Sequence, residues 1–160
     1  MDQLIPLVKE IYKRIAGTSE EISMFYTSQL QKDNFGEILA LHREKDILHQ
    51  RSTAGIHKDD LAFKLNGNLF KQIASQGQRK SLLFALKLAE YEVIKNNKGF
   101  SPILLLDDVF EKLDDNRMGN LLNWVCKENN GQVIITDTHK QRLQEAFVML
   151  GVNGQVIELE

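Results

Sequence analysis

The chain opens with apolar side chains at intervals of three or four residues, which predicts an amphipathic helix that ends at Gly17. The apolar positions are Leu4, Ile5, Leu7, Val8, Ile11, Tyr12 and Ile15. Apolar residues then alternate with more polar ones between Ile22 and Tyr26, which predicts a short strand. A second helical pattern runs from about Asp33 to Gln50, and we expect its apolar side at Leu39, Leu41, Ile47 and Leu48.

A β-hairpin and a long helix follow. Alternating Leu61, Phe63 and Leu65 lead into Asn66-Gly67, a pair typical of two-residue hairpin turns, and Leu69 begins the return strand. Ser75 is a good N-cap for the next helix, which the sequence Asn96-Asn97-Lys98-Gly99 ends. The apolar positions of this helix are Leu82, Leu83, Leu86, Ala89, Tyr91 and Ile94.

The second half of the chain has the pattern of a βαβ unit. An uninterrupted aliphatic run at 103–106 predicts a strand covered on both faces, as in a parallel sheet. A helix at about 115–128 and a second aliphatic run at 133–135 complete the unit. A short helix at about 141–147 and a last strand with an Asn153-Gly154 turn finish the chain. The prediction is a mixed α/β fold with a partly parallel sheet.

Composition narrows the class without identifying a function. The 160 residues include 42% hydrophobic and 26% charged residues, and the net charge is −2, so one hydrophobic core is expected. This charge neither requires nor excludes a nucleic-acid partner, and any basic patch would have to be local. Cys126 is the one cysteine, on the apolar face of a predicted helix; it indicates a core thiol and a reduced, cytoplasmic setting. The sequence shows no signal peptide, no membrane span and no zinc-binding spacing.

Two adjacent carboxylates end the aliphatic strand. Asp107 and Asp108 fall at the carboxyl end of a parallel strand, where ligands are bound. The pattern is that of a Walker B strand: one carboxylate can reach Mg²⁺ and the other can orient or deprotonate a water molecule. Adjacent strand residues point in opposite directions, so two different roles are expected. The alternative is that one of the two acids only caps the next turn.

Three further stretches carry candidate chemistry. Residues 74–78, Ala-Ser-Gln-Gly-Gln, place a hydroxyl and backbone N–H groups at a helix N-terminus, which favours phosphate. Residues 111–114, Glu-Lys-Leu-Asp, follow the acid pair, and residues 54–61, Ala-Gly-Ile-His-Lys-Asp-Asp-Leu, precede a strand. Taken singly, these stretches also fit an N-cap with a loop glycine, a helix entry and a polar turn.

In this order, the four stretches resemble the RecF branch of the ABC-type ATPases, relatives of SMC proteins. Residues 75–79 resemble the signature loop, residues 103–108 the Walker B strand and residues 111–114 the D-loop. Residues 55–61 resemble a family stretch that usually reads Gly-Pro-His-Arg-Asp-Asp-Leu, from which Ile56 and Lys58 depart. The resemblance implies the C-terminal part of an ABC-type, P-loop NTPase-like head. Residues 1–51 would be the end of a helical arm with its return strand and helix, and residues 52–160 the C-terminal half of the head.

The resemblance also implies roles for individual residues. Asp107 would bind Mg²⁺, and Asp108 stands where most ABC ATPases place a catalytic Glu. The signature-loop residues Ser75, Gln76, Gly77 and Gln78 would contact the γ-phosphate of ATP held by a partner head, and Asp114 would couple the two sites. Members are weak ATPases in which ATP promotes homodimers. Implied partners are single-stranded or gapped DNA and recombination mediator proteins, in DNA replication, repair and the SOS response.

Two features depart from a complete ATPase. No Gly-x-x-x-x-Gly-Lys-Ser/Thr loop occurs, so we expect the chain to be the C-terminal part of a longer protein and to be inactive alone. Where many ABC proteins have Thr-His after the second aliphatic strand, this chain has Thr136-Asp137, and His139 comes two residues late. A surface or capping role is expected for His139.

DNA binding has little direct support, because acids surround the basic residues Lys58, Lys64, Lys71, Arg79 and Lys80 and indicate a solvated face. Two other functions remain open. A magnesium-dependent nuclease or Toprim-like site normally needs Asp-x-Asp with an upstream Glu, whereas these acids are adjacent. A catalytically silent interaction module would show no response to ATP.

Overall fold

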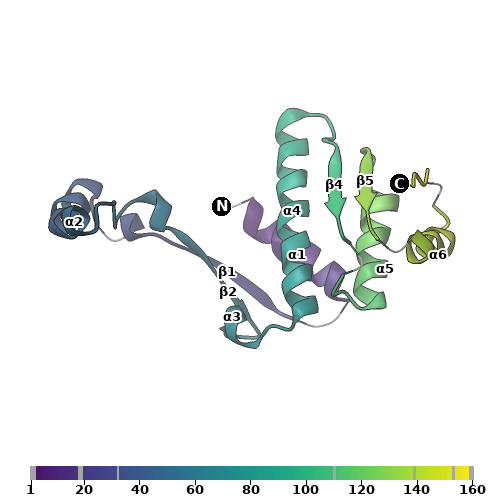
Figure 1. The fold of residues 1–160 in the computed structure, drawn as a ribbon, viewed down its shortest axis with the longest axis horizontal. Coiled ribbons are helices and arrows are strands. Elements are labelled where there is room, and N and C mark those ends of the chain that lie inside the picture. The colour runs from purple at the N-terminus through teal and green to yellow at the C-terminus, as the bar shows by residue number, and fades with distance from the viewer. Residues whose placement is uncertain are drawn as a thin grey trace. The chain divides into compact units, whose positions relative to one another are not determined.

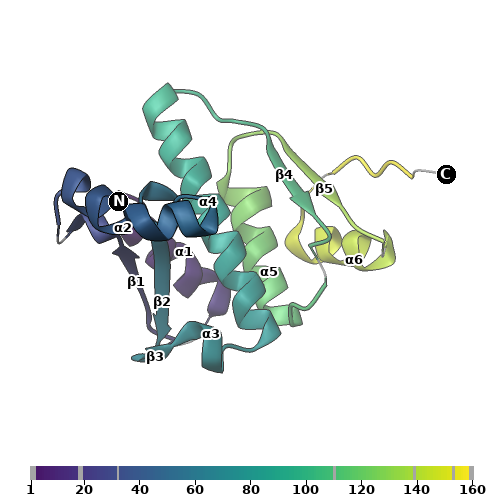
Figure 2. The ribbon, with the colours of Figure 1, turned by 60° about the vertical axis from the view of Figure 1, so that its left-hand side comes forward.

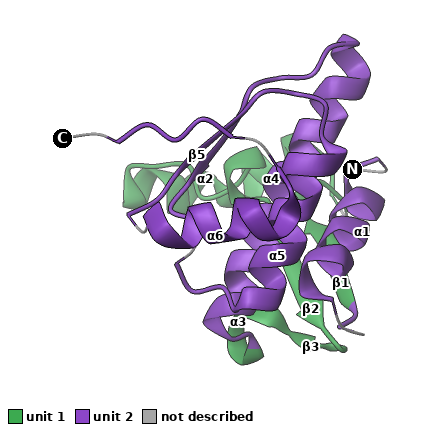
Figure 3. Cartoon of the chain, turned by 90° about the vertical axis from the view of Figure 1, so that its right-hand side faces the viewer, with its two compact units in different colours: residues 1, 22–73 green, residues 2–21, 74–160 purple. Residues whose placement is uncertain are grey.

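The computed structural model describes residues 3–17, 20–31, 33–109, 111–138, 140–152 and 154–158. The chain forms two compact units, each with its own set of contacts (Figure 1, Figure 3). The first unit comprises residues 22–73, and the second comprises residues 2–21 and 74–160. These units do not divide at residue 52, and the assignment of an arm and a head to the two sides of that residue stays a prediction.

The first unit contains a small antiparallel sheet in the order β1-β2-β3. Strand β1 (Ile22–Thr27) pairs with β2 (Asp60–Leu65), and β2 pairs with the two-residue β3 (Asn68–Leu69), which leads into α3 (Phe70–Ile73). In the hairpin turn, Asn66 and Gly67 have φ values of 48° and 81°, as a two-residue turn of this kind requires. The predicted strand and hairpin are confirmed.

Helix α2 (Phe35–His49) is present in the first unit, but the expected apolar side is wrong. Its one buried residue is Ile38, whereas Leu39, Leu41, Ile47 and Leu48 are exposed, Leu41 by 81%. Leu41 and Leu48, seven residues apart, share one side of the helix, but Leu39 and Ile47 fall on other sides, so the four positions do not form one apolar face. Single-turn 3₁₀ helices at Gln29–Gln31 and Ile56–Lys58 flank α2 along the chain.

The second unit is built on helices α1 (Leu4–Ala16), α4 (Gln76–Lys98) and α5 (Asp115–Asn123), which continues as a π-helical turn at Trp124–Glu128. Helix α1 packs against both α4 and α5 (Figure 2). The core includes the fully buried Val8, Tyr12, Ile15, Leu88, Leu121 and Leu122. Gly17 and Gly99 end α1 and α4 in the left-handed conformation, with φ of 63° and 73°. These helices and their ends are confirmed.

The second unit also contains the predicted parallel pair of strands, β4 (Leu104–Asp107) and β5 (Val133–Thr136). The expectation that both faces are covered is wrong. Leu104 and Leu106 are buried, but Leu105 is 69% exposed, and Ile103 and Ile134 are exposed as well. Side chains alternate along a strand, so one face of this sheet packs on the unit's core and the other faces water.

The C-terminal segment differs from expectation in one respect. Helix α6 (Lys140–Leu150) is present and longer than predicted. Residues 154–158 form no strand, and Asn153 of the predicted turn lies outside the described residues. Cys126 is half-buried, and burial raises the pKa of its thiol. This agrees with the expected packing role more closely than with a reactive thiolate.

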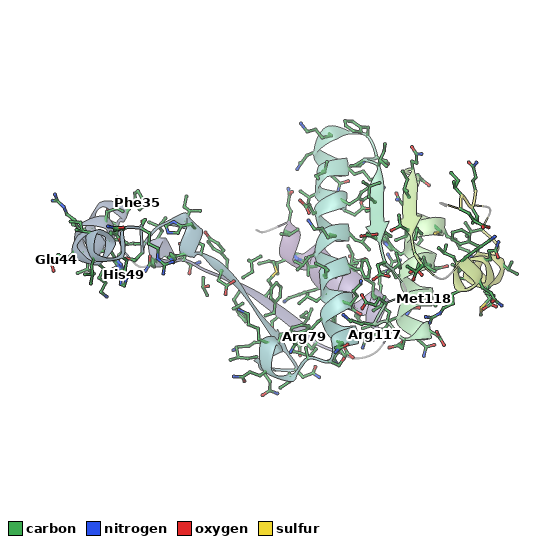
Figure 4. All side chains as sticks on the ribbon, viewed as in Figure 1. Phe35, Glu44, His49, Arg79, Arg117 and Met118 are labelled. Atoms are coloured by element: carbon green, nitrogen blue, oxygen red, sulfur yellow. The ribbon has the colours of Figure 1, made fainter. Side chains whose placement is uncertain are left out.

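A buried polar cluster joins the helices of the second unit around Arg117, which is only 8% exposed (Figure 4). Its guanidinium forms ion pairs with Glu20 at 2.5 Å and Asp114 at 3.2 Å, and it donates to the Ser81 hydroxyl at 3.1 Å. Glu20 also accepts a hydrogen bond from the Tyr12 hydroxyl at 2.6 Å. One cation therefore connects α1, the segment after it, α4 and α5.

The cluster shifts the pKa values of its members. Burial opposes ionisation of Glu20, but hydrogen bonds from Tyr12 and Gln78 and the charge of Arg117 outweigh it and lower the pKa of the carboxyl. Burial, followed by the hydrogen bond to Glu20, raises the pKa of Tyr12. The charged form of Glu20 therefore stabilises the folded state above the ordinary glutamate pKa, and this contribution is lost as pH falls through the folded-state pKa.

We expect Arg117→Met to lower the free energy of unfolding by about 3 kcal/mol, because the Glu20 carboxylate would stay buried without its cation. Glu20→Gln should cost about 1 kcal/mol, and the double variant less than the sum of the two. The cost of Glu20→Gln should shrink as the pH falls from about 7 to about 3. Urea denaturation at several pH values measures these differences.

Arg14→Met provides the matched control. Its ion pair with Glu128 is short, at 2.7 Å, but the two side chains are 46% and 40% exposed. Loss of such a pair should change stability by less than about 1 kcal/mol. Equal losses in Arg14→Met and Arg117→Met would contradict a central role for the buried cluster.

Candidate functional site

The predicted acids lie at the carboxyl end of the parallel strands, in the second unit. Asp107 is the last residue of β4 and is in register with Thr136, the last residue of β5, whose hydroxyl donates to the Asp107 carboxylate. The strand ends open onto a polar depression of about 650 Å³. Its lining residues are Asp107, Asp108, Glu111, Lys112, Thr136, Asp137, Thr138 and Arg142. The sheet geometry thus places both acids where a ligand of a parallel sheet is expected.

Asp108 leaves the strand in a left-handed conformation, with φ of 50°. Its N–H donates to the Thr136 carbonyl at 3.0 Å, and its carbonyl accepts from Lys80 Nζ at 3.0 Å. The strand alternation therefore stops at Asp107, and both residues line the same depression instead of lying on opposite faces of the sheet. This corrects the expectation drawn from strand alternation alone.

The charge state of Asp108 depends on its neighbour Glu111. A hydrogen bond with Glu111, partial burial and the negative charge of Glu111 raise the pKa of Asp108, while the cation of Lys80 opposes the rise. A hydrogen bond from Lys112 and the one with Asp108 lower the pKa of Glu111. The raised pKa makes the Asp108 carboxylate a stronger base than that of an ordinary aspartate.

The loop resembling an ABC signature forms the N-terminus of α4. Ser75 is the N-cap: its hydroxyl accepts from the Gln78 N–H at 3.2 Å, and its own N–H donates to the Gln78 side-chain oxygen at 2.9 Å. This reciprocal pair is a capping box. Gln76 and Gly77 occupy the first turn, where backbone N–H groups have no acceptor within the helix and can point at an anion.

The Gln78 side chain is engaged within its own chain. Besides accepting from Ser75, its amide nitrogen donates to Glu20 at 3.2 Å. A role for Gln78 as a direct phosphate contact would require these bonds to break. The Ser75 hydroxyl and the backbone of Gln76 and Gly77 are better placed for that contact.

Asp114 caps α5, as the simpler interpretation of its stretch predicts. It accepts from the Arg117 N–H at 2.9 Å and pairs with the Arg117 side chain. The turn before it lies against the start of α4, because a Cβ added to Gly77 would come within 3.2 Å of the Lys112 carbonyl oxygen. The stretches resembling the signature loop and the D-loop are therefore in direct contact within the second unit.

Other candidates lie elsewhere. The stretch at 54–61 belongs to the first unit, where His57 Nε2 is 3.1 Å from the Ser52 carbonyl and Asp59 accepts from the Tyr26 hydroxyl. His139 lies outside the described residues. Over the described ranges, no group of three or more His, Cys, Asp or Glu side chains is arranged to hold a metal ion.

Sequence reasoning missed Glu20 and Arg117 as support for the site. It named Thr136 only at the switch position and Glu111 only in the stretch resembling the D-loop, and it assigned Lys80 only to a solvated basic cluster. Thr136 could have been found by aligning the ends of the two aliphatic runs, because parallel strands pair in register. Arg117 and Glu20 are 97 residues apart and carry no local pattern that would connect them.

We expect Ser75→Ala to lower the free energy of unfolding by about 1 kcal/mol and to speed amide exchange at Gln78, because the helix loses its side-chain cap. Chemical denaturation and amide-exchange measurements give the two values. Ser75→Asn keeps a capping oxygen and should stay close to the wild-type values. Equal losses in both variants would show that the cap does not hold the loop.

Comparison with known proteins supports the resemblance seen in the sequence. No family model matches the chain. "DNA replication and repair protein RecF" of Parabacteroides distasonis is 39% identical over 160 residues, which is 100% of this chain and 44% of that protein. The protein of the same name from Flavobacterium johnsoniae is 38% identical over 144 residues, covering 90% of this chain and 40% of its own length.

Solved structures share the fold. The structure described as "recombination mediator protein RecF-ATP in RecFOR pathway" matches with a TM-score of 0.64 and 24% identity, over 88% of this chain and 39% of that one. Its counterpart described as RecF-ATPrS matches with a TM-score of 0.63. The chain spans less than half the length of these relatives, consistent with the predicted C-terminal portion. The predicted resemblance is confirmed, and the chain is related to the RecF family in both sequence and fold.

Proposed function

We propose that this chain is the part of a RecF-like DNA replication and repair protein that completes an ATP site between two heads. The observation that carries the proposal is the placement of Asp107 and Asp108 at the strand ends, with the capped N-terminus of α4 in the same unit. Strand-end carboxylates suit the metal side of a phosphate site, and a helix N-terminus suits the anion side.

The residues present fit Mg²⁺. Asp107 offers a carboxylate and Thr136 a hydroxyl at the edge of an open, polar depression, and Mg²⁺ in nucleotide sites takes one or two protein oxygens and completes its shell with water and phosphate. When bound, the ion would neutralise charge on the phosphates. Asp107 would hold it, and the Thr136 hydroxyl would fix the orientation of that carboxylate.

We propose that Asp108 orients the attacking water molecule and accepts a proton from it. Its raised pKa, caused first by Glu111, favours proton acceptance at its carboxylate. At the start of α4, the Ser75 hydroxyl and the N–H groups of Gln76 and Gly77 would bind the γ-phosphate held by a second copy. Gln78 would keep the loop in shape, and Asp114 would connect the loop to α5.

The names of the relatives concern DNA replication and repair and a recombination mediator of the RecFOR pathway. Beyond these words, we propose what the family resemblance implies: single-stranded or gapped DNA as a ligand, recombination mediator proteins as partners, a cytoplasmic location and a role in recombinational repair and the SOS response. None of the helices within the described ranges is long and apolar enough to cross a membrane. Nucleotide-dependent dimerisation would link ATP to DNA binding.

The chain by itself should not hydrolyse ATP at a measurable rate, because its sequence has no glycine-rich phosphate loop to hold the β- and γ-phosphates. Phosphate release from purified chain with ATP and Mg²⁺ tests this. Turnover that disappears in Asp107→Ala would contradict the prediction, since it would show a complete site within these 160 residues. Turnover that survives Asp107→Ala would indicate a contaminating ATPase.

In the whole protein that carries this sequence, ATP should increase the dimer fraction and the affinity for gapped DNA. Ser75→Arg should abolish both ATP effects, because a bulky side chain would occupy the proposed phosphate position. Gln132→Arg, which alters an exposed residue next to the amino end of β5, is the matched control and should leave both effects intact. Light scattering and fluorescence anisotropy measure the two effects, and an unresponsive wild-type protein would refute the proposal.

A further inference from the structure

The geometry points to Lys80 as a positioning residue that ties the start of α4 to the backbone of Asp108. This inference rests on the proposed function, because it concerns how the group that would accept the proton is held. The Lys80 ammonium donates to the Asp108 carbonyl at 3.0 Å. Lys80 is half-buried and lies one helical turn after Gln76, so it moves with the signature-like loop.

Asp108 needs such support because of its backbone. A left-handed conformation is unfavourable for a residue that has a Cβ, although less so for aspartate than for most, and Asp108 has φ of 50°. Two hydrogen bonds fix it there, one from its N–H to the Thr136 carbonyl and one from Lys80 to its carbonyl. The first bond ties Asp108 to the sheet, and the second ties it to α4.

The Lys80 side chain is itself held in place. Its ammonium lies 5.5 Å from the centre of the Phe84 ring, one turn further along α4, and Phe84 is buried. A cation over an aromatic face is attracted to it, which limits the rotamers that this lysine adopts. The donor is therefore directed at the Asp108 carbonyl by a packed side chain of the same helix.

A second contact joins the same two segments. Lys112, like Asp108, is left-handed, with φ of 64°, and its carbonyl oxygen lies against Gly77 in the first turn of α4. Buried Val109 and Leu113 anchor the segment between Asp108 and Asp114 to the core. A shift of the first turn of α4 would therefore press on this segment at Lys112 and pull on it at Asp108. Phosphate binding at the loop and the placement of Asp108 would be mechanically linked.

A simpler role for Lys80 is to balance negative charge, because its cation acts on both Asp108 and Glu111, and Asp137 adds negative charge at Asp108. The two roles differ in what they require of the side chain. Charge balance requires only a cation nearby, whereas positioning requires a donor at the Asp108 carbonyl. Lys80→Gln keeps a donor without the charge, Lys80→Arg keeps both, and Lys80→Met keeps neither.

The test uses the whole protein that carries this sequence and combines two measurements. Lys80→Met should lower kcat at least tenfold with KM for ATP within about twofold, because loss of one hydrogen bond to a charged donor corresponds to roughly tenfold or more in rate. It should also speed amide exchange of Asp108, whose N–H bond to Thr136 depends on the same backbone conformation. Lys80→Arg should recover most of both values, and Lys80→Gln should recover more than Lys80→Met.

Lys87→Met is the control, because Lys87 lies on α4 and pairs with Glu90 in exposed positions. It should leave kcat and the exchange of Asp108 unchanged. Wild-type kcat and exchange in Lys80→Met would overturn the inference, as would recovery by Lys80→Arg but none by Lys80→Gln, which would indicate charge balance. If Lys80→Met does not fold, Lys80→Gln and Lys80→Arg still separate the two roles. A wild-type protein without ATP turnover would refute the proposed function, whereas faster Asp108 exchange in Lys80→Met would still support the positioning contact.

Discussion

The ion pair between Arg117 and Glu20 is the contact on which the second unit depends. Taking a guanidinium and a carboxylate out of water is unfavourable unless each is fully bonded, and here both are: Arg117 has Glu20, Asp114 and Ser81, and Glu20 has Tyr12 as a further donor. The members of the cluster satisfy one another only when α1, α4 and α5 are held close together, because Tyr12, Ser81 and Arg117 come from these three helices. The two stretches with candidate chemistry, at the starts of α4 and α5, are both fixed by that arrangement.

The same cluster explains why some residues of the signature-like loop are structural. The Gln78 side chain forms hydrogen bonds with Ser75 and Glu20 and so shapes the loop. The groups with unused hydrogen-bonding capacity are the backbone N–H groups in the first turn of the helix. Asp108, in contrast, does not support the loop but is supported by other residues. Hydrogen bonds with Thr136 and Lys80 hold its backbone, and its carboxyl interacts with Glu111 at the depression. Supporting groups and the groups proposed to react are thus separated within a few residues of sequence.

Features determined by short-range chemistry could be predicted from the sequence. Gly17, the Asn66-Gly67 turn and the Ser75 cap each act through backbone preferences of one or two residues, and all three occur where expected. The position of Asp107 followed from strand polarity. Burial was harder to predict: Leu41 and Leu105 are apolar but exposed, because burial depends on which surfaces meet and not on residue type. The left-handed backbone of Asp108 and its contact with Lys80 depend on tertiary packing, which no local pattern carries.

The water-facing side of the β4–β5 sheet has a practical consequence. Three aliphatic side chains on this side are exposed, those of Ile103, Leu105 and Ile134, and Leu105 and Ile134 are opposite each other in the strand register. Chaperones and proteases recognise exposed hydrophobic surfaces of this kind. Synthesis of this polypeptide on its own would therefore attract cellular quality control, and a fusion or co-expressed partner that shields those three side chains would raise its yield.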